Sequence, residues 1–269
     1  MRLVDSFVGI VPQEPTFEGA LKAVELAARV SHLSEDKITD DSYKEFCDKL
    51  LSIGHLSPFE FGTIYLTIPS SSNTVFTQFF YRNNKFSEAV FGDDFTYVTT
   101  NLRVIYENKR EKDLKYISTP TEFHKKRINT HWVCSRAIQQ ELTRHRAFSF
   151  LWESTRWVGY DKSKFNSELV FVKPSWYWEE KNDSIDRKLA CKRFEKALQD
   201  IEDDYLFLRE KDLTPQEARH VLPLALKSEG YMCGFESDWK GKNGFLEQRT
   251  SKTADPDIQV LANKLLELM

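Results

Sequence analysis

Apolar residues recur at helical spacing in several parts of the chain. The spacing predicts amphipathic helices over residues 17–32, 41–53, 131–146 and 184–210, and a last helix that begins at DPDI (255–258). In the last of the four ranges, the apolar residues step by four and three positions and form one stripe: Phe194, Leu198, Ile201, Tyr205 and Leu208. TPQE (214–217) is a capping box and predicts a helix that carries Arg219 and runs to about residue 223.

Runs of β-forming residues separate these helices. We expect strands over 61–68 and 97–108, and a strand followed by an aromatic loop over 167–178. The charged stretch NKREKDLK (108–115) is typical of a solvated loop or helix end. Because the chain shows no repeat, no linker and no regular strand–helix alternation, the prediction is a single α+β domain over 1–269, with a mixed sheet flanked by helices.

Composition narrows the class of protein. Hydrophobic residues make up 41% of the 269 residues and charged residues 29%, as in globular proteins. No apolar run approaches the ~20 residues of a membrane helix, and MRLVDSFVGI lacks the pattern of a signal peptide, so we expect a cytoplasmic protein without a membrane partner.

Cysteine spacing and glycine motifs exclude several kinds of site. Cys47, Cys134, Cys191 and Cys233 lie far apart in the sequence, so we expect free thiols in the core rather than nucleophiles, and no metal site. Neither a dinucleotide fingerprint nor a P-loop occurs.

Cations and aromatic residues gather in RHRAFSFLWESTR (144–156). The net charge of −3 argues against nucleic acid as the partner and favours one small anion. Guanidinium groups grip phosphate or a carbonyl edge with paired hydrogen bonds, and aromatic rings such as Phe148 and Phe150 suit a flat heterocycle. A nucleotide or flavin site is one interpretation. The other is a helix end whose arginines form surface ion pairs, with both rings merely packing the loop.

The spacing of this segment resembles a known signature. Arg144, His145 and Arg146, seven residues and then Ser154 match the RHR-x7-S motif of the flavin-dependent thymidylate synthases, and Trp157 continues the likeness. Other segments resemble the family in the same order: AARVSH (27–32), GHLSPFEF (54–61), EARHVLPL (217–224) and FLEQR (245–249). Residues 70–130 look like an expansion. The chain departs from the usual pattern at Phe61, at Leu151-Trp152, at Thr253 and in KGKNG (240–244).

The resemblance implies an activity. Members of this family convert dUMP to dTMP with methylenetetrahydrofolate as carbon donor, FAD as electron carrier and NADPH as reductant, and they use no cysteine nucleophile. They assemble as homotetramers with active sites shared between subunits. Negative charge develops on the pyrimidine during methylation, and a guanidinium at its N3/O4 edge stabilises that charge; the resemblance assigns this catalytic role to Arg249.

The resemblance also implies site residues. The residues expected at dUMP are Glu141, Arg144, Trp152, Glu153, Ser154, Thr155, Arg156, Arg219 and Arg249. Those expected at FAD are His55, Ser57, Arg144, His145, Arg146, Trp152, Asp238, Lys240 and Gly244. His55 has an alternative interpretation as a capping or surface histidine. The alternatives for the whole chain are a non-catalytic nucleotide- or nucleic-acid-binding module and a relative that acts on another pyrimidine nucleotide.

Overall fold

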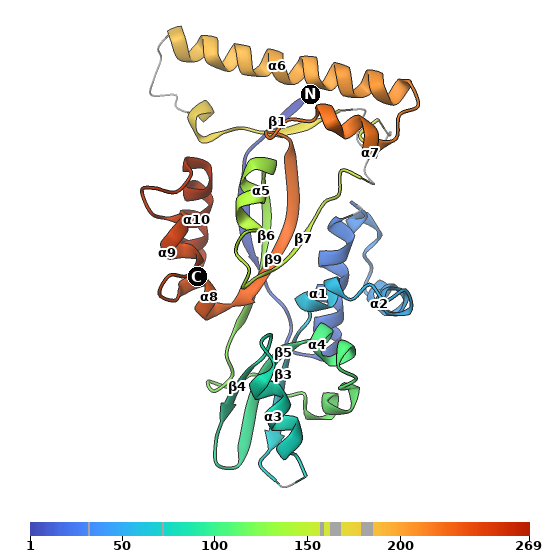
Figure 1. Cartoon of the computed structure of the whole chain (residues 1–269), viewed down its shortest axis with the longest axis vertical. Coiled ribbons are helices and arrows are strands. Elements are labelled where there is room, and N and C mark those ends of the chain that lie inside the picture. The colour runs from blue at the N-terminus through green and yellow to red at the C-terminus, as the bar shows by residue number, and fades with distance from the viewer. Residues whose placement is uncertain (32, 72, 157–158, 162–167, 179–184) are drawn as a thin grey trace.

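Two long antiparallel strands, β6 (Arg127–Ser135) and β9 (Lys227–Phe235), run through the centre of the molecule (Figure 1). With β2 (Phe7–Val11) and β7 (Ser149–Trp152) they form an antiparallel sheet in the order β2-β6-β9-β7. The structure is a computed structural model, and it describes all residues except 32, 72, 157–158, 162–167 and 179–184. Trp157 and His32, which belong to the family-like segments, lie outside the described residues.

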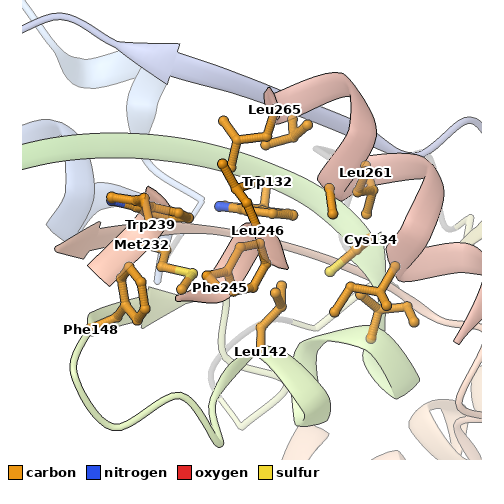
Figure 2. Packing of buried hydrophobic residues seen from close by; sticks show 14 residues of the cluster. Trp132, Cys134, Leu142, Phe148, Met232, Trp239, Phe245, Leu246, Leu261 and Leu265 are labelled. Carbon is orange, nitrogen blue, oxygen red and sulfur yellow. The ribbon is translucent and has the colours of Figure 1, made fainter. Parts of the chain in front are cut away.

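Three C-terminal helices cover one side of the central sheet. These are α8 (Glu236–Lys240), α9 (Phe245–Arg249) and α10 (Pro256–Leu268). Trp132 and Met232 from the strands pack with Phe245, Leu261 and Leu265 in one core cluster (Figure 2). Each such side chain contributes ~1.5–3 kcal/mol when it is fully buried. The helix predicted from DPDI is therefore confirmed, although its last apolar residue, Leu268, is exposed.

Helices α1 (Phe17–Val30) and α2 (Ser42–Ser52) confirm the two predicted N-terminal helices. Thr16 begins α1 because its side chain accepts a hydrogen bond from the Gly19 amide. The inner face of α1 packs on β9 through a cluster that includes Ala27, Val30 and Tyr231. The 3-10 helix η2 (Ser57–Phe61) adds Phe61 to the same cluster.

Residues 63–116 build a second layer at the other end of the molecule. Strands β3 (Thr63–Pro69), β5 (Phe95–Asn101) and β4 (Glu88–Phe91) form an antiparallel sheet, accompanied by α3 (Val75–Asn83), α4 (Leu102–Glu107) and the 3-10 helix η3 (Glu111–Tyr116). The strand predicted over 61–68 is confirmed. The strand predicted over 97–108 is wrong beyond Asn101, because the Asn101 side chain accepts from the Val104 amide and starts α4.

The long helix α6 (Ile185–Glu210) confirms the prediction for 184–210 and lies across the end near the N-terminus (Figure 1). Below it, β1 (Arg2–Val4) and β8 (Val170–Val172) pair in parallel, and the aromatic segment is the 3-10 helix η5 (Ser175–Trp178). Glu202 of α6 is buried and accepts from the Leu169 amide at 2.6 Å, which ties the helix to this strand pair. The sequence pattern missed this polar contact.

The capping box of TPQE is confirmed, since Thr214 and Glu217 bond each other's backbone amide groups. The helix it starts is shorter than predicted. Helix α7 (Pro215–Ala218) ends before Arg219, which opens the 3-10 helix η6 (Arg219–Val221).

The helix predicted over 131–146 is wrong in its first third. Residues through Ser135 belong to β6, and α5 (Arg136–Leu142) begins only there. Trp132 and Cys134 are fully buried while His131 and Val133 are half-buried, which is the two-residue period of a strand. Pairing with β2 and β9 outweighs the helical spacing of the apolar residues.

The α+β class is confirmed. Among the described residues, parallel pairing is confined to β1 and β8. No described helix has the length and apolar character needed to cross a membrane. The cysteines are free; Cys47, Cys134 and Cys233 are buried, as predicted, and Cys191 is half-buried.

Candidate active site

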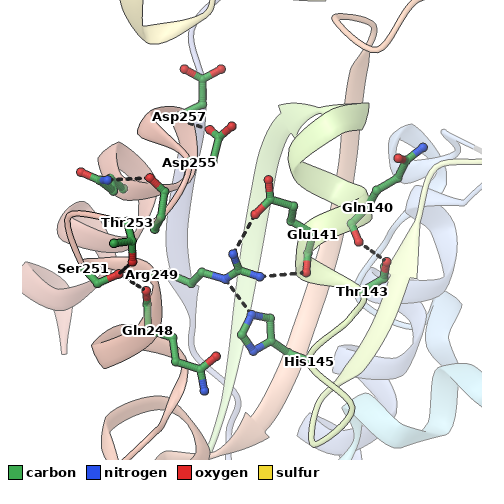
Figure 3. A network of polar contacts seen from close by, with 12 residues as sticks. Gln140, Glu141, Thr143, His145, Gln248, Arg249, Ser251, Thr253, Asp255 and Asp257 are labelled. Atoms are coloured by element: carbon green, nitrogen blue, oxygen red, sulfur yellow. Dashed lines mark hydrogen bonds and ion pairs between the residues drawn. The ribbon is translucent and has the colours of Figure 1, made fainter.

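Arg249 lies at the end of α9 and is held by the last turn of α5 (Figure 3). Its Nε donates to Nε2 of His145 at 2.8 Å, and its Nη1 donates to Oε2 of Glu141 at 2.7 Å. Its Nη2 donates to the Glu141 carbonyl oxygen at 3.4 Å. Phe245 and Leu246 are buried at the start of α9 and fix the helix from which the guanidinium projects.

His145 is neutral at physiological pH. Burial and the neighbouring charge of Arg249 lower the pKa of its imidazole to about 4. Since Nε2 accepts from Arg249, the ring proton resides on Nδ1. The ring also packs edge-on against Phe245, with centroids 5.0 Å apart.

Arg144 and Arg146 flank this histidine and are both exposed. Neither guanidinium makes a hydrogen bond or ion pair with any residue that the structure describes. Phe148, by contrast, belongs to the core and packs against Trp239 at 4.5 Å between ring centroids. The packing interpretation of this ring is therefore correct.

A second group of candidate residues follows β7. Glu153 is buried, pairs with Lys227 at 3.0 Å and accepts from the Tyr160 hydroxyl at 3.3 Å. The Ser154 amide donates to the Ser31 carbonyl oxygen at 3.2 Å, and Ser154 Oγ accepts from the amide of Arg156 at 3.3 Å. Thr155 is buried and Arg156 is exposed.

Trp152 lies directly on Gly230 of the neighbouring strand. A Cβ at position 230 would stand 2.4 Å from Cε3 of Trp152, so this contact requires glycine. The Trp152 Nε1 is buried and bonds to none of the described residues.

Three of the residues expected at FAD build the support of α9. Asp238 accepts from the Phe235 amide, and Lys240 donates to Glu236 and to the Met269 carbonyl oxygen. Gly244 closes the turn before α9, where a Cβ would lie 2.7 Å from the Gly241 carbonyl oxygen. These contacts join α8 to the end of β9, to the turn before α9 and to Met269.

The remaining candidates lie apart from both groups. Arg219 is half-buried in η6, next to Ala218, which belongs to the core cluster of Tyr160. His55 is exposed after Gly54, and Ser57 begins η2. The structure thus brings Glu141, His145 and Arg249 together and keeps 153–156 in a separate group. Within the described part of the chain, the hydrogen bonds and the ion pair of the Arg249 side chain go to Glu141 and His145, not to the second group.

One well-formed cavity lies elsewhere in the molecule. It measures about 430 Å³ and lies between α5, β6 and α10, where Cys134, Ile138 and Leu261 form part of its wall. None of the predicted site residues lines it. The described residues also contain no group of His, Cys, Asp and Glu side chains able to hold a metal ion.

Sequence reasoning missed Lys227, Glu229 and His131. Glu229 accepts from Lys227 at 2.6 Å and contacts Nε2 of His131 at 2.8 Å. Burial opposes ionisation of Glu229, but His131 and Lys227 together lower its pKa to about 2. Charged residues at positions 227 and 229 of an otherwise apolar strand were the signal that could have found this cluster.

Fold and polar groups together define an α+β protein with an arginine-centred site. The chain belongs to the thymidylate synthase complementing protein family, Thy1, whose model matches residues 117–269. This range contains every predicted site residue except His55 and Ser57. The resemblance read from the RHR-x7-S motif is therefore confirmed.

Among solved structures, the chain is similar to a UMP/dUMP methylase, PolB from Streptomyces cacaoi, bound with 5-Br dUMP. The identity is 18%, the alignment covers 98% of this chain and 90% of that chain, and the TM-score is 0.46. No curated protein sequence matches the chain.

Proposed function

We propose that the protein is a flavin-dependent thymidylate synthase that methylates dUMP to dTMP, with methylenetetrahydrofolate as carbon donor and NADPH-reduced FAD. The observation that carries the proposal is the pair of hydrogen bonds by which Glu141 and His145 hold the Arg249 guanidinium. Glu141 and His145 hold one guanidinium from two sides, at 2.7 and 2.8 Å, across more than 100 residues of sequence. Membership of the Thy1 family supports the same activity.

The geometry suits an arginine that polarises a pyrimidine. The three bonds to Glu141 and His145 use one N–H on each nitrogen of Arg249, and each Nη keeps a second N–H. These remaining donors can face the N3/O4 edge of uracil, where they stabilise the negative charge that develops at methylation. A neutral His145 contributes by accepting from Arg249 without adding a second positive charge beside it.

The residues present fit FAD in part. Arg144 and Arg146 offer exposed guanidinium groups for a pyrophosphate, and Trp152 offers a buried Nε1 without a described partner. Asp238 bonds to the end of β9, Lys240 bonds to Met269 and Gly244 packs closely on Gly241, so we assign these three residues to the support of the helices around Arg249. FAD, when bound, supplies the redox chemistry, and the protein binds, orients and polarises the substrate.

We further propose that two copies of the chain complete each site, within a homotetramer. Arg249, Glu141 and His145 form one half, and Ser154, Thr155 and Arg156 form the other. The resemblance to a family whose members share active sites between subunits supports this division.

The experiment is tritium release from dUMP labelled at C5, measured with FAD, NADPH and methylenetetrahydrofolate. Wild-type protein is expected to bind FAD, turn yellow and release tritium. Arg249→Ala is expected to lower the rate about 100-fold or more, as for loss of an anion-stabilising donor. Arg193→Ala is the matched control, because Arg193 is exposed on α6, and it should keep the wild-type rate.

Three other outcomes would contradict the proposal. Protein that remains colourless with added FAD points to a non-catalytic binding module. Yellow protein that releases tritium only from another pyrimidine nucleotide identifies a relative with a different substrate. An Arg249→Ala variant with the wild-type rate removes the assigned role of Arg249.

A further inference from the structure

A chain of ionisable side chains runs inside the central sheet, away from Arg249. Tyr160 donates to Oε1 of Glu153 at 3.3 Å, and Lys227 contacts Oε2 of Glu153 at 3.0 Å. Lys227 also donates to Oε2 of Glu229 at 2.6 Å. His131 contacts Oε1 of Glu229 at 2.8 Å and extends the chain of side chains onto β6.

Glu153 is the most buried member of this chain of side chains, and Lys227 is its charged partner. The Glu153 side chain is 1% exposed and that of Lys227 is 17% exposed. Burial raises the pKa of Glu153, and the nearby ammonium group opposes that rise. Removing one partner alone would leave an uncompensated charge inside the protein, whereas removing both would not.

Glu153 stands directly before the segment Ser154–Arg156. Its amide donates to the Glu229 carbonyl oxygen at 2.8 Å, which is the last backbone contact of the segment with β9. Beyond it, Ser154 bonds to Ser31 after the end of α1. The segment therefore leaves the sheet directly after Glu153, and the buried side chain of Glu153 fixes the position of that point.

Lys227 is tied to the other half of the candidate site through the backbone. It pairs in the β6–β9 ladder with Ser135, whose side chain caps α5 by accepting from the Ile138 amide at 3.3 Å. The preceding residue, Leu226, accepts from the Arg136 amide at 3.0 Å. Helix α5 carries Glu141 and leads to His145.

We infer that Lys227 is a positioning residue: its ammonium, bound to Glu153, holds Ser154–Arg156 in place relative to α5. This inference rests on the proposed function, because it assigns that segment to nucleotide binding. Lys227 itself does not touch the substrate. It acts through Glu153 on the segment that does.

The test compares four variants with wild type. Lys227→Met and Glu153→Gln each remove one charge, the double variant removes both, and Lys227→Arg restores the charge. Lys196→Met is the matched control, since Lys196 forms an exposed ion pair with Asp200 on α6. The readouts are KM and kcat for dUMP, flavin absorbance, thermal stability, and hydrogen exchange of the amides of residues 154 and 156.

Lys227→Met is expected to raise KM for dUMP about tenfold or more, since small misplacements of binding groups are costly, while flavin absorbance stays unchanged. Exchange at residues 154 and 156 should quicken by a similar factor, and Lys227→Arg should restore both values. The double variant should recover thermal stability but keep the raised KM and the fast exchange. Lys196→Met should match wild type throughout.

The inference would be overturned if the double variant regained the wild-type KM and slow amide exchange along with thermal stability. The ion pair would then serve stability alone. Unchanged exchange and KM in Lys227→Met would overturn it as well. If wild-type protein does not bind dUMP, the proposed function fails. The exchange rates at 154 and 156 still decide whether Lys227 positions the segment.

Discussion

At the scale of single residues, the contact between Arg249 and His145 depends on an uncharged imidazole. The folded-state pKa of about 4 lies below the ordinary value of 6.5. Folding therefore favours the neutral ring, and the stability gained from this is complete above pH 6.5. It is lost as the pH falls from 6.5 towards 4, where the ring takes up a proton and repels Arg249.

This predicts an NMR titration. The ring signals of His145 should report a pKa near 4, well below the ordinary value of 6.5. In Arg249→Ala the pKa should rise towards 6.5, because the neighbouring charge is gone while burial remains. A wild-type pKa at or above 6.5 would contradict the assignment of His145 as a neutral acceptor.

A second residue-scale prediction concerns Gly230. Gly230→Ala places a Cβ 2.4 Å from both the Leu151 carbonyl oxygen and Cε3 of Trp152, and the backbone oxygen cannot rotate away. We expect a loss of ~1–3 kcal/mol in the free energy of unfolding, measured in urea. Gly9→Ala is the matched control in another strand, because its Cβ meets only the ring of Phe7 at 2.9 Å. Equal losses in the two variants would show that the Trp152 contact is not the cause.

At the scale of secondary structure elements, the short helix α5 carries one half of the candidate site. With seven residues it has little stability of its own, so its N-cap matters. Ser135→Ala removes the side-chain acceptor for the Ile138 amide, and we expect a loss of ~1 kcal/mol in unfolding free energy.

Ser52→Ala is a suitable control for this cap, since Ser52 is exposed at the end of α2 and bonds only within its own helix. Thermal or urea unfolding measures both variants. An unchanged stability in Ser135→Ala would mean that packing of Ile138 and Leu142 alone fixes α5.

Elements with their own local signals could be predicted from the sequence. α6 follows a single apolar stripe, and α7 follows the Thr214–Glu217 capping box. The errors occur where a strand passes directly into a helix, at Ser135 and at Asn101. There the strand depends on partners far away in sequence, such as β9 for β6, and a local pattern contains no information about them.

The candidate site also combines residues with a recognisable local sequence signal and residues whose role depends on distant partners. The family resemblance singled out Glu141, His145 and Arg249 from separate segments, and the structure brings these three side chains together. It could not reveal Lys227, because the partner of that residue, Glu153, lies 74 positions earlier and their contact depends on the β7–β9 pairing. Nor could it show that Asp238 and Lys240 are used to support α9.

At the scale of the whole molecule, the separation of the two candidate half-sites predicts complementation between copies. Arg249→Ala and Arg156→Ala should each be nearly inactive alone. After subunit exchange in an equimolar mixture, about a quarter of the wild-type activity should return, because some sites receive an intact half from each chain.

Tritium release and native mass spectrometry of the mixture measure this together. The mass spectrum must show mixed tetramers before the activity is compared. Mixed assemblies without recovered activity would place both arginines in a half supplied by the same chain.

The order of strands in the central sheet has a consequence for synthesis on the ribosome. More than 100 residues separate β2 from β6, and about 90 residues separate β6 from β9, yet β6 lies between the other two strands in the sheet. Until the C-terminal third of the chain has emerged, β6 has an open edge that can pair with other nascent chains. The layer of β3, β5 and β4, with its close sequence spacing, can form much earlier. We therefore expect that slow translation or loss of chaperones causes aggregation through β6 first. Folding of the sheet of β3, β5 and β4 should be affected only later.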